Sequence, residues 1–219
     1  STLEGIVFCS QLYSILAVDS AGKPLSNSLM WADNRSVSQA ADVRRTASSD
    51  LSRRTGCPIQ PLYPLTKILW LKANLELPHD AKFVAIKDYV LYRLTGQLVA
   101  DRATASASGL VNVSTCQWDA EALHICGLTE DNLPDLVSTR HIIRKWRTDV
   151  SQYIGIPADT PLIVGAGDAS VANIGVGAIT DGTLAVNVGT SAAARVLTTQ
   201  PQVDPAGRLW TYIADVGHW

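Results

Sequence analysis

The stretch Pro161-Leu-Ile-Val-Gly-Ala-Gly-Asp-Ala169 decides the fold class of this sequence. Residues 161–164 have the apolar character and the length of a short buried strand, and a glycine-rich run continues from them to Gly177. Asp168 therefore follows the carboxyl end of a strand, among neighbours so small that a ligand can reach its side chain. Ligands of α/β folds bind at this end of the strands, so the stretch predicts both a class and a candidate site.

Strand-like and helix-like patterns alternate along the rest of the chain, which is typical of the α/β class. Expected strands cover residues 6–9, 13–18, 25–31, 83–86, 184–188 and 192–197. Expected helices cover residues 36–54, 65–75, 88–94, 120–126 and 169–178. Residues 13–18 and 25–31 are expected to pair as a β-meander, and residues 210–219 have a strand pattern that reaches the last residue.

The composition narrows the function. The chain has 219 residues, of which 47% are hydrophobic and 17% charged, and its net charge is −2. This charge does not favour a nucleic-acid-binding surface, and the longest apolar runs are far shorter than the roughly 20 residues that cross a bilayer. We therefore expect a cytoplasmic protein with neither nucleic acid nor membrane as partner; a homo-oligomer is compatible with the sequence.

Cysteines and histidines form no pattern of their own. The four cysteines are scattered, with no Cys-x-x-Cys pair, and the four histidines have no partner at metal-ligand spacing. The pattern fits buried free thiols in a reducing compartment and non-catalytic histidines. We expect no metal-ligating residues.

Two roles fit Asp168. Its carboxylate could take the proton from a hydroxyl that attacks an electrophile. Asp is also a favoured helix N-cap, and residues 169–178 could be the helix that it begins. The local pattern fits both roles equally well.

Gly189-Thr190-Ser191 lies between two strand-like runs and predicts a tight hairpin. Backbone N–H groups and hydroxyls in such a turn can bind phosphate oxygens, although the three residues also suit a plain turn. The spacing of a Walker phosphate-binding loop is absent.

Trp31-Ala-Asp-Asn-Arg35 places an indole, a carboxylate, an amide and a guanidinium between an expected strand and an expected helix. An aromatic face suits the C–H side of a polyol, and the polar groups suit its hydroxyls or a carboxylate. Alternatively, Asp33 or Asn34 caps the helix and Arg35 is solvated.

Three further side chains are expected to have structural roles. Lys67 and Trp70 lie three residues apart on one helix face, which indicates a buried Trp beside a Lys that extends its ammonium to solvent. Asp101 precedes an Ala/Ser-rich turn and is expected to cap it.

Taken together and in order, these segments resemble the FGGY carbohydrate kinases, which share the actin-like, ribonuclease-H-like ATPase fold. Eight segments, covering nearly the whole chain, carry the resemblance. They are Gln11-Leu-Tyr-Ser-Ile-Leu-Ala-Val-Asp19, Trp31-Ala-Asp-Asn-Arg35, Pro64-Leu-Thr-Lys-Ile-Leu-Trp-Leu71, Lys87-Asp-Tyr-Val-Leu-Tyr-Arg-Leu-Thr-Gly96, Asp101-Arg-Ala-Thr-Ala-Ser-Ala-Ser-Gly-Leu110, Trp118-Asp119, Gly165-Ala-Gly-Asp-Ala169 and Gly189-Thr-Ser-Ala192.

The resemblance implies a role for each candidate residue. Asp168 would be the base that deprotonates a substrate hydroxyl for attack on the γ-phosphate of ATP, with Mg²⁺ bridging the phosphates. Residues 189–191 would match the second phosphate-binding hairpin of the family. The sugar site would be formed by Gln11, Leu12, Tyr13, Trp31, Asp33, Arg35 and Ala169.

Within the family, the details look most similar to gluconate kinases, whose substrate carries a carboxylate that a cation such as Arg35 could bind. One departure concerns Leu12-Tyr13, where many relatives have Met-His. A kinase for xylulose, ribulose, fuculose or glycerol is therefore the alternative substrate assignment. A catalytically silent sugar-binding protein is the alternative of another class.

Two parts of the family pattern are absent from this sequence: the Asp-x-Gly-Thr phosphate hairpin at the start, and the second lobe with the adenine pocket. We therefore expect residues 1–219 to form the first, sugar-binding lobe, incomplete at both ends. We expect this chain alone to be inactive as a kinase.

Overall fold

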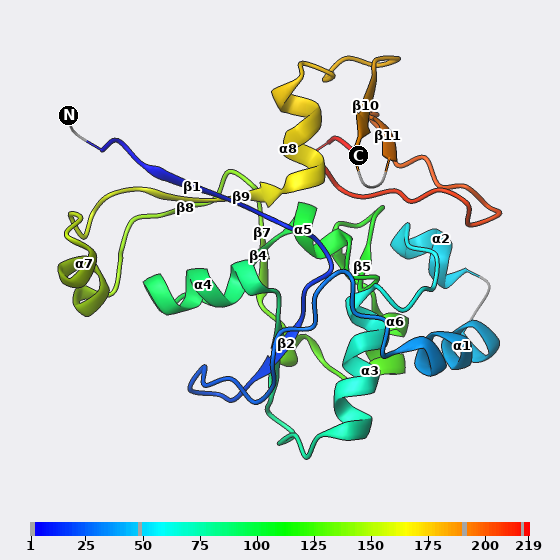
Figure 1. Cartoon of the computed structure of the whole chain (residues 1–219), viewed down its shortest axis with the longest axis horizontal. Helices are drawn as coiled ribbons and strands as arrows, with labels where there is room; N and C mark the ends of the chain where they lie inside the picture. Colours follow the sequence, from blue (N-terminus) through cyan, green and yellow to red (C-terminus); the bar gives the residue numbers. More distant parts are fainter. Residues whose placement is uncertain (1–2, 48–49, 190–191, 216) are drawn as a thin grey trace.

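The computed structural model describes residues 3–47, 50–189, 192–215 and 217–219 (Figure 1). A three-stranded sheet joins β1 (Ile6–Ser10), β9 (Leu162–Gly167) and β8 (Ile142–Ile143), with β9 in the middle. β1 runs parallel to β9, and β8 runs antiparallel to it. The start of the chain thus pairs with the strand predicted at residues 161–164, which is confirmed and extends to Gly167.

The described residues form four further sheets of two strands each. The predicted hairpin near the C-terminal end is confirmed as an antiparallel pair of β10 and β11. The members and bounds of the four sheets are β2 (Leu16–Val18) with β3 (Lys82–Val84), β4 (Val99–Asp101) with β7 (Asp135–Val137), β5 (Val111–Asn112) with β6 (Gln117–Trp118), and β10 (Leu184–Val188) with β11 (Ala192–Val196).

Helices lie between these strands, as the α/β class predicts. Pro64 opens α3 at a position where a helix needs no N–H donor, and the Asp88 carboxylate accepts a hydrogen bond from the Ala85 N–H at the start of α4. The helices are α1 (Val37–Thr46), α2 (Leu51–Thr55), α3 (Pro64–Asn74), α4 (Ile86–Thr95), α5 (Arg102–Ser106), α6 (Ala120–Cys126), α7 (Thr148–Ile154) and α8 (Asp168–Gly175), with a short 3₁₀ helix at Glu130–Asn132.

The predicted meander is wrong. Residues 25–31 form no strand, and β2 pairs with β3 instead. Only isolated bridges join Ile15 to Leu29 and Val18 to Pro24. The Ala17 N–H donates to the Ser26 hydroxyl, so a side chain replaces a backbone carbonyl and interrupts the ladder.

The single helix predicted over residues 36–54 is two helices, α1 and α2. The break falls in Ala47-Ser-Ser-Asp50, where Ser and Asp favour helix ends over helix interiors; residues 48 and 49 lie outside the described part of the chain.

The strand predicted at residues 210–219 is also wrong. Among the described residues of this segment, an isolated bridge joins Asp215 to His218 around Gly217, which has a φ of 77°. The segment instead bonds to loops of the α/β body: the Thr211 N–H donates to the Gly56 carbonyl at 2.9 Å.

The largest hydrophobic cluster holds α3 against α1, α6 and the β2–β3 pair, with Ile68 and Leu71 almost completely buried. All four cysteines are free, as predicted, although Cys9 is exposed. Across the described residues, we find no helix with the length and apolar character needed to cross a membrane.

Candidate active site

Asp168 is the first residue of α8 and follows directly on β9 (Figure 1). Gly167 occupies the N-cap position, so Asp168 is not the cap that one of the two interpretations required. The Asp168 carboxylate accepts one hydrogen bond, from the N–H of the next residue, Ala169, at 2.8 Å. Asp168 is exposed and Ala169 is half-buried. The carboxylate is therefore accessible to a ligand.

Leu12 packs against the turn that leads from β9 into Asp168. A β-carbon added to Gly167 would lie 2.3 Å from the Leu12 Cδ2 and 3.6 Å from the Thr104 hydroxyl. Leu12 is only 6% exposed. Its side chain thus packs under the end of β9, which makes it a support for Asp168 rather than an exposed wall.

Tyr13 is the next residue along, and its backbone is unusual. Its φ is 66°, in the left-handed region that bulky residues rarely adopt. Burial raises the pKa of Tyr13, and the charge of Asp168 adds to this effect. Because Leu12 packs at Gly167, the backbone of Tyr13 begins near the turn that presents Asp168.

Three aromatic residues that sequence reasoning missed surround Tyr13. The Tyr13 and Tyr212 hydroxyls are 3.0 Å apart, and those of Tyr63 and Tyr212 are 2.8 Å apart. The Trp210 indole N–H donates to the Tyr13 hydroxyl at 3.4 Å. Tyr212 and Trp210 belong to the segment that was predicted as a strand, so their alternation was interpreted as a sheet pattern.

The segment that begins at Trp31 forms a second group. Trp31 is 60% exposed. An Arg35 Nη lies 2.8 Å from the Asp33 carboxylate, and the Arg35 guanidinium lies 4.7 Å from the centre of the half-buried Trp70 ring. Burial would raise the pKa of Asp33, but hydrogen bonds from Arg35 outweigh it and lower that pKa.

The alternative in which Asp33 or Asn34 caps the following helix is wrong. Ser36 is the N-cap of α1. Because Asp33 and Trp70 orient the guanidinium, Arg35 is held in place instead of moving freely in solvent.

Lys67 connects the two groups, and its predicted position is wrong. The Lys67 side chain is completely buried instead of reaching solvent. Its ammonium donates to the carbonyls of Tyr13, at 3.0 Å, and Met30, at 2.7 Å. A third link is the Gln11 amide, which lies 3.2 Å from the Met30 sulfur. Residues 11–13 and 30–35 are thus brought together by contacts on Met30.

Gly189 is exposed at the end of β10. Thr190 and Ser191, the other two residues of the predicted phosphate hairpin, lie outside the described residues. We find no hydrogen bond or ion pair between Gly189 and the other candidate residues in the described part of the chain.

Asp101 has the structural role that was predicted. Its carboxylate accepts a hydrogen bond from the Thr104 N–H at 2.8 Å and so caps α5. It also forms a buried ion pair with Lys87. This pair anchors the start of α5, whose Thr104 lies against Gly167.

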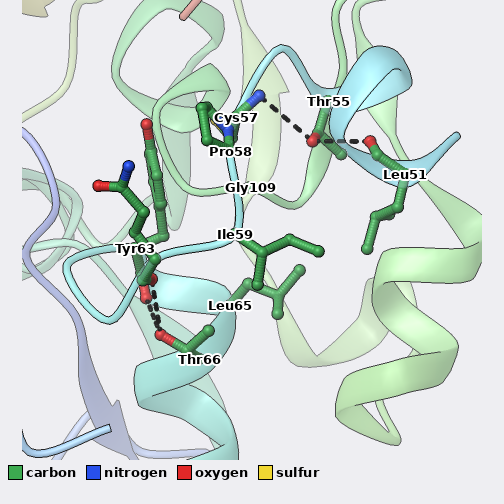
Figure 2. A pocket seen from close by; sticks show the side chains of 10 residues that line it. Leu51, Thr55, Cys57, Pro58, Ile59, Tyr63, Leu65, Thr66 and Gly109 are labelled. Atoms are coloured by element: carbon green, nitrogen blue, oxygen red, sulfur yellow. Dashed lines mark hydrogen bonds between the residues drawn. The ribbon is translucent and has the colours of Figure 1, made fainter. Parts of the chain in front are cut away.

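Two hollows near these residues are too small for a sugar. One of them, between α2 and α3, has a volume of about 10 Å³ and is lined by Tyr63, Thr66 and Pro58 (Figure 2). Another, of about 30 Å³, reaches from Tyr13 to Asp88. Such volumes hold one or two water molecules, so neither of these two hollows is a sugar pocket.

A family model for the N-terminal domain of the FGGY family of carbohydrate kinases matches residues 1–175. The chain therefore belongs to the FGGY family of carbohydrate kinases. Curated relatives include the gluconokinases of Bacillus licheniformis (39% identical) and Bacillus subtilis strain 168 (38% identical), each over 98% of this chain and 42% of the relative.

Solved structures from Lactobacillus acidophilus are also similar, one titled gluconate kinase and one titled ligand-bound xylulose kinase. Each gives a TM-score of 0.93 at 35% identity and covers all of this chain and 45% of that chain. The expected α/β fold of the actin-like ATPases is thereby confirmed. This chain spans less than half the length of these relatives.

Proposed function

We propose that residues 1–219 form the sugar-binding lobe of an ATP-dependent carbohydrate kinase in which Asp168 is the general base. The accessible Asp168 carboxylate at the end of β9, where Leu12 packs at Gly167, carries this proposal. Membership of the FGGY family supports it. The location in the cytoplasm, predicted from composition, remains part of the same proposal.

In the proposed reaction, Asp168 accepts the proton of a substrate hydroxyl while that oxygen forms a bond to the γ-phosphorus of ATP. The bond between the γ-phosphorus and the oxygen that bridges it to the β-phosphate breaks, and ADP leaves with the electron pair. The products are a sugar phosphate and ADP, with the proton on Asp168. Asp168 makes no ion pair in the described structure, so its carboxylate is available as the acceptor.

The substrate surface in this proposal includes Gln11, Tyr13, Trp31 and Arg35. Trp31 offers an exposed indole face to the C–H side of a polyol. The Arg35 side chain is 46% exposed, and its guanidinium, which pairs with Asp33, would offer its remaining N–H groups to a substrate carboxylate. Together with the two gluconokinases at 38–39% identity, this favours gluconate as substrate.

Xylulose is the second candidate substrate, because a neighbour with the same TM-score and identity is titled xylulose kinase. Arg35 would discriminate between the two substrates, because gluconate has a carboxylate that the guanidinium can bind and xylulose has none. A sugar-binding protein without kinase activity is the alternative of another class.

We find no group of three or more His, Cys, Asp or Glu among the described residues that could hold a metal ion. In kinases Mg²⁺ is held by one or two carboxylates together with the phosphates of the substrate. Asp168 is the exposed carboxylate available at the site. When bound, Mg²⁺ would neutralise phosphate charge; Gly189, with Thr190 and Ser191, is proposed to contact those phosphates.

An ADP-release assay with Mg·ATP tests the function. The complete polypeptide that contains this chain, and the 219-residue chain itself, are offered gluconate, xylulose, ribulose and glycerol. We expect turnover of gluconate by the complete polypeptide only, lowered by Asp168→Ala by about three orders of magnitude or more. Sugar binding and thermal stability should survive this substitution, because Asp168 neither caps α8 nor forms an ion pair.

Turnover of xylulose instead would keep the mechanism and change the substrate. A folded complete polypeptide that binds a sugar but turns over none of the four would favour the silent sugar-binding protein.

A further inference from the structure

We propose that Lys67 is a positioning residue that fixes the shape of the candidate sugar surface by holding its two segments together. The inference rests on the proposed function, and it assigns a role to a residue that makes no contact with solvent. Lys67 lies on α3, outside both segments, and its buried ammonium bridges the Tyr13 and Met30 carbonyls.

The first carbonyl belongs to a residue whose backbone is disfavoured. Tyr13 has a φ of 66°, a conformation that persists in a bulky residue only where its surroundings hold it. The Tyr13 ring packs edge-on against Tyr63, with ring centres 5.5 Å apart. Lys67 holds the other end of the residue, so ring and carbonyl are fixed from opposite sides.

The second carbonyl organises the turn that presents Trp31. The Met30 carbonyl accepts hydrogen bonds from Lys67 and from the Asp33 N–H, at 2.7 and 3.0 Å. The peptide group between Met30 and Trp31 is therefore fixed in plane, and with it the start of the exposed Trp31 side chain. Together with the Ile15–Leu29 bridge and the Gln11 contact on Met30, the Lys67 ammonium thus fixes the placement of Tyr13 relative to Trp31.

The charge of Lys67 suits this task. Burial lowers the pKa of Lys67 from 10.5 to about 8, a fall that the nearby Asp33 carboxylate partly offsets. At neutral pH the ammonium keeps its charge, which strengthens both hydrogen bonds to carbonyl oxygens. A neutral side chain of similar size would leave the Tyr13 carbonyl without this donor and the Met30 carbonyl with only the Asp33 N–H.

Lys72, on the same helix, provides a matched control. Its ammonium also donates to two carbonyls, those of Cys126 and Gly127, each at 2.7 Å. These belong to the end of α6, away from the candidate sugar segments. Lys72→Met therefore removes two lysine–carbonyl hydrogen bonds from α3, at an exposed position, without touching Tyr13 or Met30.

The experiment compares Lys67→Met with Lys72→Met by two measurements. The first is backbone amide hydrogen exchange of the 219-residue chain, which needs no ligand. We expect Lys67→Met to speed exchange about tenfold or more in residues 11–15 and 29–33, and Lys72→Met to do so only around residues 126–128. Equal exchange in residues 11–15 and 29–33 of wild type and Lys67→Met, or faster exchange throughout the chain in both variants, would overturn the inference.

The second measurement is steady-state kinetics of the complete polypeptide with gluconate. We expect Lys67→Met to raise KM about tenfold or more while kcat falls by less, because a misplaced binding surface leaves Asp168 in position. Lys72→Met should leave both constants near wild type. A fall in kcat with unchanged KM would contradict a positioning role at the sugar surface.

Lys67→Arg covers the case in which Lys67→Met does not fold. Arg keeps the donors and the charge, so we expect a folded protein with a KM between those of wild type and an unanchored surface. If Lys67→Met does not fold, a folded Lys67→Arg in which residues 11–15 and 29–33 exchange faster than in wild type while KM stays unchanged would overturn the inference. If the wild-type polypeptide shows no turnover, the proposed function is rejected. The role of Lys67 in linking the two segments is tested separately, by the hydrogen-exchange data.

Discussion

Gly165 and Phe8 approach so closely that only glycine fits between β9 and β1. A β-carbon at Gly165 would lie 1.7 Å from the Phe8 carbonyl oxygen, and Gly165 has a φ of 72°. The register of the two parallel strands shifts at this point, between Val7 and Cys9. Three residues later β9 has ended and α8 presents Asp168, so this contact sets where the candidate base emerges.

Gly165→Ala should therefore destabilise the chain strongly. Gly155→Ala is the matched control, because Gly155 has the same φ of 72° and a β-carbon there would meet nothing within 4 Å. We expect Gly155→Ala to lower the free energy of unfolding by about 1–2 kcal/mol, the left-handed penalty alone. Gly165→Ala should cost at least about 2 kcal/mol more, from the clash. Urea denaturation measures the free energy of unfolding of both variants. Equal losses would mean that β1 shifts to accommodate the added methyl group at little cost.

Arg35→Met should change substrate preference. The guanidinium stacks on Trp70 and is oriented by Asp33, so we expect the KM for gluconate to rise about tenfold and the KM for xylulose to change about threefold or less. The measurement is ADP release by the complete polypeptide with each sugar.

Arg45→Met serves as its control, because Arg45 pairs with Asp42 on the exposed surface of α1. It should leave both KM values unchanged. If Arg35→Met raised the KM for gluconate and for xylulose equally, Arg35 would support the surface without contacting a carboxylate.

Asp88 should make stability depend on pH. It is buried, its Oδ1 meets no hydrogen-bond donor among the described residues, and burial raises its pKa from 3.8 to about 7. Between pH 4 and 7 the folded state keeps a proton that the unfolded state releases, so this carboxyl makes the free energy of unfolding fall as pH rises through that window. Each unit of pKa shift corresponds to about 1.4 kcal/mol, so the free energy of unfolding could fall by up to about 4 kcal/mol across this window.

Asp88→Asn should flatten this dependence, because an amide does not titrate. Urea denaturation at pH 5 and pH 8 compares the variant with wild type. An unchanged difference between the two pH values would show that other carboxyl groups cause the dependence.

The buried pair of Lys87 and Asp101 should respond strongly to the loss of one partner. Both side chains are at most 1% exposed, so Lys87→Met leaves a buried carboxylate without its cation and should cost about 3–5 kcal/mol. Arg147→Met breaks the exposed pair with Asp149, which water and salt screen, and should leave stability near wild type. Thermal or urea unfolding gives both values; a small loss for Lys87→Met would indicate that water reaches Asp101.

Local patterns determined a large part of the fold. The apolar run at residues 161–164, the Pro before α3 and the Asp119 that caps α6 each act within a few residues, so their elements were predictable. The order of eight short segments pointed to the family, which the comparison with the family model confirmed. Asp168 was identified as a candidate for the same reason, since its accessibility follows from its small neighbours.

Only the tertiary structure decided how these residues meet. The alternation in residues 210–219 predicts a strand, but the segment bonds to Gly56 and brings Tyr212 to Tyr13, 199 residues away. Lys67 looked like a surface residue beside a Trp, yet packing buried it between two carbonyls of other segments. A side-chain pattern sets the local conformation of an element. Its partners depend on which distant surfaces exclude water together, which no short stretch of sequence contains.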